Sequence, residues 1–331
     1  MTLRRCMKDA GRALRLPFEW LGILVGVLVF SFLPRRAMLK LCDFLSSIMY
    51  AFDLRGRKYA LANLRIVLGR FPADGIYHIR LFPYDPTKAE EKIIRRSYRN
   101  MGRAVGHAFW TCRCAKSRVE KSGEMEERCV RFLAENKPAV TVSGHIGCWE
   151  ILSQLAFLNG HRMMSVAKDI GTSGMTDLLM KARTSIGQEI VHADGAFRPL
   201  MEGLKNGKSL GLLVDQVVSP RKGGIWVRFF GRPHPVSAAP AFFAAKGHVP
   251  IVVAWSRPLK DGRYRCEMLD IIESGESRDI WATTQRCIKD LERVIRRHPS
   301  CWVLNYNCFR KRPGEKERAE LAERERKAKE A

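Results

Sequence analysis

The sequence predicts an α/β fold, a layered mixed sheet flanked by helices. The alternation of strand-like apolar runs with helix-like stretches after residue 136 predicts it. A later helix is expected at roughly Ile280 to Arg297, near the end of the chain. The strand-like runs are Ala139–Val142, Met163–Ala167, Glu189–His192, Ser209–Val214 and Pro250–Trp255, and the intervening helix-like stretches lie near 174–184, 196–206 and 237–246.

The N-terminal part predicts a membrane-associated helical region. The apolar run from Pro17 to Pro34 contains one charge, Glu19, and is marginal as a span, because a perpendicular helix needs ~20 apolar residues. Basic residues flank it on both sides, so they set no clear orientation. A second apolar stretch, Leu39 to Phe52, follows. We expect an anchor made of a helix and an interfacial partner. A cleaved signal peptide is the alternative, but no small-residue cleavage site follows.

These patterns divide the chain into four expected parts. Residues 1–54 form the basic segment and anchor, and 55–135 form a mainly helical, basic region packed on the core. Residues 136–313 form the α/β core. Residues 314–331 form a charged tail, which we expect to be a solvated helix or disordered, without an assigned function.

The charge balance predicts an anionic partner. The formal net charge is +24, which attracts nucleic acid, anionic lipid or an acidic carrier protein without choosing among them. The chain has no Cys/His zinc spacing, RNP-like aromatic signature or basic helix-turn-helix pattern, so we expect no nucleic-acid partner. Ten cysteines without a regular framework favour a reducing compartment. Cys112 and Cys114 are too close for a zinc knuckle and are interpreted as ordinary thiols.

His145 and Glu150 are the most informative pair in the chain. Gly144 ends the apolar strand, and helical spacing begins at Trp149, so His145 lies in a strand-to-helix turn and Glu150 in the first helical turn. A carboxylate there can hydrogen-bond one imidazole nitrogen and leave the other to take a proton from a hydroxyl. The pair therefore predicts a general base and its orienting carboxylate. The alternative is a capping histidine and a surface glutamate, since short motifs also arise by chance.

This segment resembles the H-x4-D/E motif of the glycerolipid acyltransferase superfamily, and the wider chain resembles its bacterial lipid A (late, or secondary) acyltransferase branch. Further segments match in the same order, from about Arg57 to Pro313. They are Arg57, Ala60, Asn63, Leu64, Phe71 and Pro72, then Arg96–Arg103, Gly211–Gln216, Phe229–Pro233, Ala239–Ala241 and Arg310–Pro313. Two departures leave donor or acceptor specificity open: Cys148 where the family commonly has Asn, and Asn305–Cys308 where it has a His-Arg pair.

The resemblance implies an O-acyltransferase that needs no cofactor. Such an enzyme moves a fatty acyl chain from acyl carrier protein or CoA to a hydroxyl of an anionic lipid A precursor, at the cytoplasmic face of the bacterial inner membrane. The closest alternative is a lysophospholipid or other glycolipid acyltransferase. Another is a membrane-docked lipid-binding protein without catalytic activity.

The resemblance also implies roles for single residues. His145 is the expected general base and Glu150 its orienter. Arg183 stands where the branch uses an arginine for activity, and Asp215, at a strand end, is the expected supporting residue. Arg232 and Lys222 are further candidates for binding a phosphate or carboxylate of the acceptor. The alternatives are a surface charge for Arg183, a helix cap for Asp215 and solvated loop cations.

Two other chemistries can be considered from the sequence. Cys148 beside His145 allows an acyl-cysteine intermediate, but a hydroxyl can attack a thioester directly, and cysteine is commonly a small buried hydrophobe. His192 and His234 could join His145 at a metal. Their spacing matches no standard ligand pattern, so we expect no metal.

Overall fold

The computed structural model describes residues 28–71, 82–167, 186–276 and 279–330, together with Gly26, Met180 and Thr184. Its centre is a seven-stranded sheet in the order β1-β9-β8-β2-β5-β3-β4. Neighbouring strands are parallel except for the β8/β9 pair, so the predicted mixed sheet is confirmed. The strands are β1 (Gly123–Met125), β2 (Val140–Ser143), β3 (Met163–Ala167), β4 (Glu189–His192), β5 (Ser209–Leu213), β8 (Ile251–Pro258) and β9 (Tyr264–Ile272), with a separate antiparallel hairpin of β6 (Gly224–Phe229) and β7 (Arg232–Ser237).

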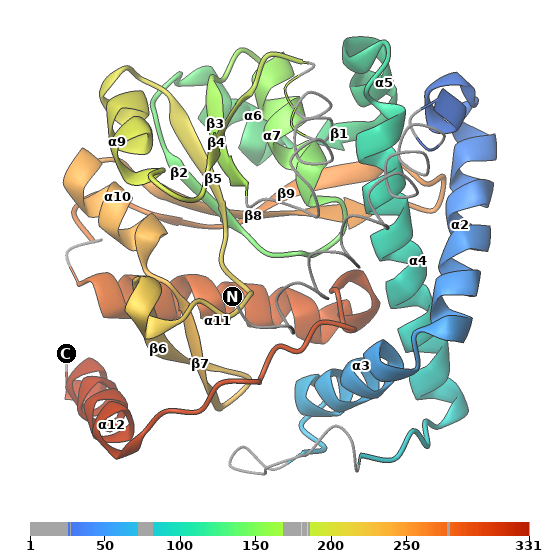
Figure 1. Ribbon diagram of the computed structural model, residues 1–331. Coiled ribbons are helices and arrows are strands. Elements are labelled where there is room, and N and C mark those ends of the chain that lie inside the picture. The colour runs from blue at the N-terminus through green and yellow to red at the C-terminus, as the bar shows by residue number, and fades with distance from the viewer. Residues whose placement is uncertain are drawn as a thin grey trace, which may run out of the picture.

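Helices cover both faces of this sheet (Figure 1). In that view α11 (Ile280–Arg297) runs below the sheet, α6 (Glu127–Ala134) and α7 (Trp149–Leu158) lie above it, and α2 (Arg35–Phe52) and α4 (Lys88–Trp110) run side by side at one end. The other helices are α3 (Leu54–Val67), α5 (Ala115–Ser122), α9 (Phe197–Lys205), α10 (Ala239–Gly247) and α12 (Glu315–Glu330), with 3-10 turns η1 (Pro220–Lys222) and η2 (Pro299–Cys301).

The central strands are buried on both faces, as expected where helices lie on either side. Along β8, Ile251, Val253 and Trp255 join the larger core, which also contains residues of α11. The intervening Val252 and Ala254 join the core that contains residues of α7. The alternation follows the two-residue period of a strand and explains why these residues form a continuous apolar run.

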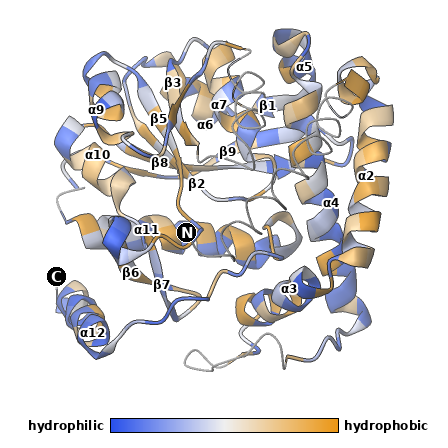
Figure 2. Ribbon diagram, in the orientation of Figure 1, coloured by the Kyte–Doolittle hydropathy of each residue, from blue (hydrophilic) through white to orange (hydrophobic). Residues whose placement is uncertain are grey.

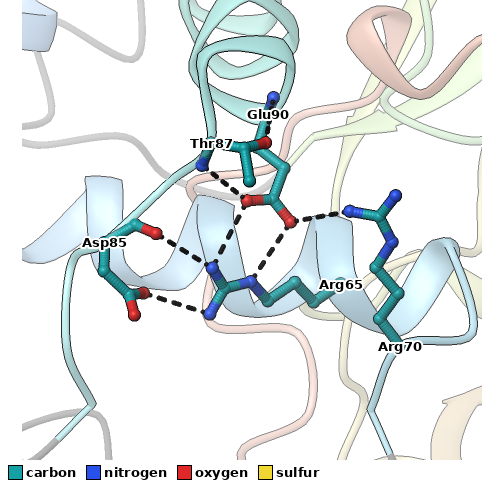
Figure 3. A network of polar contacts seen from close by, with 5 residues as sticks. All are labelled: Arg65, Arg70, Asp85, Thr87 and Glu90. Atoms are coloured by element: carbon teal, nitrogen blue, oxygen red, sulfur yellow. Dashed lines mark hydrogen bonds and ion pairs between the residues drawn. The ribbon is translucent and has the colours of Figure 1, made fainter.

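A buried carboxylate fixes α3 to the start of α4 (Figure 3). Glu90 is 2% exposed and completes a capping box with Thr87. Arg65 donates to both carboxylate oxygens at 3.2 and 3.3 Å, and Arg70 donates at 3.2 Å. Burial alone would raise the pKa of Glu90, but the bonds from Arg65 and Thr87 lower it. Farther along α3, Asn63 donates to the carbonyls of Leu304 and Tyr306, each at 2.7 Å, and thereby positions the C-terminal loop.

The predicted membrane-associated region is described only in part. Most of the run from Pro17 to Pro34 lies outside the described residues, and the stretch from Leu39 to Phe52 is contained in α2. Among the helices that the structure describes, none is both long enough and apolar enough to cross a bilayer. Part of the helix-like stretch predicted near 174–184 also falls outside the described residues. The charged tail forms α12.

Candidate active site

The strand register brings His145 and Asp215 together. Strands β2 and β5 are parallel neighbours, and Ser143 pairs with Leu213 at the end of their ladder. His145 and Asp215 each follow two residues later, at the same carboxyl edge of the sheet. Residues at this edge are those that α/β enzymes use to bind and convert ligands.

The side chains of these two residues form a hydrogen-bonded pair. His145 Nδ1 lies 2.8 Å from Asp215 Oδ1. The Asp215 side chain is 3% exposed, whereas that of His145 is 22% exposed and therefore accessible. With the Nδ1 proton donated to the carboxylate, Nε2 keeps the lone pair that a general base requires. The side-chain amide nitrogen of Gln216 lies 3.3 Å from His145 Nε2.

Trp302 holds the second oxygen of the same carboxylate. Its Nε1 donates to Asp215 Oδ2 at 2.9 Å from a position that is 2% exposed. Burial alone would raise the pKa of Asp215, but the charge interaction with His145 and hydrogen bonds from His145 and Trp302 hold that pKa below its usual range. Asp215 is therefore ionised at neutral pH, with both oxygens oriented.

The backbone around His145 is fixed by two neighbouring segments. Val303 donates to the His145 carbonyl at 3.1 Å, and Gly147 donates to the Cys301 carbonyl at 2.8 Å. Gly147 has φ +66°, and a Cβ there would overlap the Ser256 carbonyl, so the position needs glycine. The Ser256 hydroxyl accepts from the Cys148 amide and donates to the Cys148 carbonyl, both at 2.8 Å. These contacts fix the turn that carries His145.

Glu150 occupies the predicted first turn of α7 and is 8% exposed. Its Oε1 accepts from Trp149 Nε1 at 3.1 Å, and the Trp149 ring packs edge-on against the His145 ring, with centroids 5.0 Å apart. Within the described residues, the carboxylate bonded to His145 is Asp215, which the sequence suggested only as a supporting residue. The orienting role of Glu150 stays a prediction.

Of the three other predicted anion-binding residues, the structure describes Arg232 and Lys222. Arg183 lies outside the described residues. Arg232 is 7% exposed at the start of β7, with its guanidinium carbon 5.3 Å from the Phe71 ring centroid and 5.8 Å from that of Phe309. Lys222 is exposed in η1. The Arg232 guanidinium therefore lies near two aromatic rings, those of Phe71 and Phe309.

Cys148 and His234 are buried, and His192 lies at the surface. Cys148 is fully buried, and burial raises the pKa of its thiol far above the usual range, which disfavours a thiolate nucleophile. Burial also lowers the pKa of His234 to about 4, and its Nε2 lies 3.2 Å from the Asp215 carbonyl oxygen. His192 ends β4 at the surface. Over the described part of the chain, no three His, Cys, Asp or Glu side chains are grouped to hold a metal ion.

The segment that departs from the family pattern lies beside the site. Asn305 donates to Asp53 at 3.4 Å, and Asn307 donates to the Tyr59 hydroxyl at 3.1 Å. Cys308 is buried, with Sγ 3.8 Å from the Asp215 carbonyl oxygen. This segment therefore packs between α3 and the strand end that carries Asp215.

The fold is an α/β sheet that presents a hydrogen-bonded His–Asp pair at its carboxyl edge. The family model for bacterial lipid A biosynthesis acyltransferases matches residues 7–311, which is most of the chain. The chain belongs to this family and is an acyltransferase. No curated protein matches it significantly.

Proposed function

We propose that this acyltransferase moves a fatty acyl chain from an acyl carrier protein or CoA thioester to a hydroxyl of a lipid A precursor, at the cytoplasmic face of the inner membrane. The observation that carries the proposed mechanism is the 2.8 Å contact between His145 Nδ1 and Asp215 Oδ1. This contact sets the tautomer in which Nε2 accepts a proton. The family match supports the lipid A acceptor.

His145 acts as the general base. Its Nε2 removes the proton of the acceptor hydroxyl while the hydroxyl oxygen attacks the thioester carbonyl carbon. A tetrahedral intermediate forms, the carbon–sulfur bond breaks, and the leaving thiolate takes the proton back from the imidazolium. Asp215 stabilises that imidazolium because the carboxylate is ionised and buried beside it.

Two further residues act beside His145: Gln216 directly, and Glu150 through Trp149. The Gln216 amide faces Nε2 at 3.3 Å, so an acceptor hydroxyl that reaches Nε2 comes within hydrogen-bonding range of this amide. Glu150 acts through Trp149, which packs on the His145 ring and donates to the Glu150 carboxylate. Arg183 and Arg232 are the proposed contacts for the negative charge of the acceptor.

A second candidate acceptor is a lysophospholipid or another glycolipid. The observation that favours it is the position of Asn305–Cys308, the segment that departs from the family pattern and that packs against the Asp215 strand end. A changed segment there alters the surroundings of the acceptor without altering the base.

The test is mass spectrometry of lipid A from a host that lacks its own late acyltransferases and expresses either this chain or its His145→Ala variant. We expect a mass gain of one acyl chain with the parent and none with the variant, at equal protein levels. The size of the gain gives the chain length. No gain with well-expressed parent protein would reject the lipid A acceptor and favour the second candidate.

A further inference from the structure

The charged tail is not solvated on all sides. Helix α12 begins beyond residue 311, where the match to the family model ends. Glu317, Leu321 and Glu325 recur every four residues and therefore share one face of the helix. Leu321 is 2% exposed and belongs to the larger core. The other residues of α12 whose burial the structure describes are exposed, and Figure 2 shows a mostly hydrophilic helix. The tail therefore docks through one narrow face.

The docked face lies against strand β6 of the hairpin. Glu325 accepts two hydrogen bonds from the Arg228 guanidinium, from Nε at 2.7 Å and from Nη2 at 3.1 Å. Such a bidentate pair fixes the orientation of the guanidinium. The remaining nitrogen, Nη1, donates to the Gly231 carbonyl at 3.3 Å. A single arginine thus connects α12 to the turn between β6 and β7.

The turn that Arg228 reaches has an unusual backbone. Its central residues, Phe230 and Gly231, have φ +52° and +76°. Two-residue hairpin turns with positive φ at both positions favour glycine or asparagine. A phenylalanine in this conformation is uncommon and depends on support from its surroundings. Arg232 follows the turn directly, as the first residue of β7.

Helix α11 supports one end of this turn. Gln285 accepts from the Arg228 amide at 2.7 Å and donates to the Arg228 carbonyl at 2.9 Å. Glu292 accepts from the Phe230 amide. The Phe230 ring packs near Trp302, with centroids 5.8 Å apart. The bonds from α11 therefore fix the end of the turn that faces the buried Trp302, and they do not involve α12.

Helix α12 supports the other end of the turn. Glu325 orients the guanidinium that bonds the Gly231 carbonyl, and Arg232 is the next residue. We propose that α12 is a clamp that positions Arg232 for a phosphate of the acceptor. This inference rests on the proposed function, which assigns Arg232 to the negative charge of the acceptor. Because the end of the turn near Trp302 is held by α11, the clamp acts on acceptor binding and not on the His145 base.

The first test is hydrogen exchange of the full chain, measured by mass spectrometry over residues 224–237 and 315–330. Leu321→Ser/Glu325→Gln removes the docking contacts, and the matched control Ala322→Ser/Glu323→Gln changes exposed residues of the same helix. A helix of 16 residues is marginal in water on its own. Exchange in α12 should therefore become roughly tenfold faster in the docking variant, and exchange in the hairpin several-fold faster. The control should exchange as the parent does.

The second test is steady-state kinetics with a phosphorylated lipid A precursor. The docking variant should raise the acceptor KM roughly tenfold, with kcat changed less than about twofold. Arg232→Gln should also raise this KM. Adding the docking substitutions to Arg232→Gln should raise it little further, because both changes act through one side chain. Thermal melts verify that each variant folds.

Arg228→Lys separates docking from positioning. Lysine keeps a cation for Glu325 but lacks the fork that reaches Glu325 and Gly231 together. We expect α12 to stay protected from exchange in this variant while the acceptor KM rises. Parental KM in Arg228→Lys would overturn the proposed route through the Gly231 carbonyl.

Faster exchange in α12 with a parental hairpin and a parental KM would overturn the proposal. Unchanged exchange in the docking variant, or KM increases that add fully to that of Arg232→Gln, would do the same. A parent that transfers no acyl chain to the precursor would defeat the proposed function. Coupled loss of protection in α12 and the hairpin would then still support the clamp, because exchange does not require turnover.

Discussion

His145 and Asp215 stand at equivalent positions beyond two paired parallel strands, and their side chains meet at 2.8 Å although 70 residues separate them in the chain. Trp302 holds the far oxygen of Asp215, so three segments of the chain converge on one carboxylate. The parallel register of β2 and β5 thereby orients the base that we propose.

Trp302→Phe removes the hydrogen bond to Asp215 Oδ2 and keeps an aromatic ring in the core. We expect turnover to fall roughly tenfold with KM little changed. We also expect unfolding to become easier by about 1–3 kcal/mol, because a buried carboxylate oxygen loses its donor. Steady-state kinetics and denaturant melts measure both effects. A stability loss with parental turnover would restrict Trp302 to a structural role.

Gly147→Ala should displace the segment that carries His145. The position has φ +66°, and an added Cβ would overlap the Ser256 carbonyl. We expect a loss of activity of roughly a hundredfold, because small displacements of catalytic groups are costly. The matched control is Gly160→Ala, which also has positive φ (+86°) but open space around it, and should cost only about 1 kcal/mol of stability. Equal effects of the two changes on turnover would contradict this account.

The buried His234 should make the protein less stable in mild acid. Burial lowers its pKa from 6.5 to about 4, so between these values the unfolded chain binds a proton that the folded chain does not. Stability is therefore fully present above pH 6.5 and falls as the pH drops toward 4, by on the order of 3 kcal/mol in total. Denaturant unfolding at several pH values measures this slope.

The His234→Gln variant is the control for this pH dependence, because glutamine does not titrate. It should show a shallower slope than the parent even where its absolute stability is lower. Burial lowers the pKa of His107 to about 4 as well, so part of the slope should remain. Identical slopes in parent and variant would show that His234 is not the titrating group.

Glu150→Gln removes a charge while keeping an oxygen that can accept from Trp149. If the carboxylate charge supports the imidazolium, turnover should fall by roughly tenfold. The comparison is made at one pH with saturating donor. Parental turnover would reject the role that the sequence motif predicts for Glu150.

Strand β8 was predictable because its apolar, partly β-branched run is buried on both faces. The expected ranges of β3, β4 and α11 coincide with the observed ones. Strand β9 was not predicted although Tyr264, Cys266 and Met268 are buried in alternation, because charged residues interrupt its apolar run. Strand β1 has only three residues. The β6–β7 hairpin was not predicted from the sequence, because Pro233 and Pro235 disfavour a strand assignment.

The candidate site was predictable only in part. The position of His145 follows from a strand ending at a glycine, and Asp215 was placed at a strand end. Their contact depends on which strands are neighbours and in what register, and local spacing does not encode either. Trp302 lies 87 residues from Asp215 and carries no local signal for its role. The motif spacing singled out Glu150, the acid nearer in sequence.

The most direct test of the central claim is the acyl-transfer rate of the Asp215→Asn variant, measured with purified protein, a thioester donor and a lipid A precursor. Asparagine fits the same space but does not stabilise the imidazolium, so we expect kcat to fall at least about a hundredfold with KM little changed. A circular dichroism melt verifies the fold of the variant. Turnover equal to that of the parent would contradict the claim that Asp215 orients His145 for catalysis.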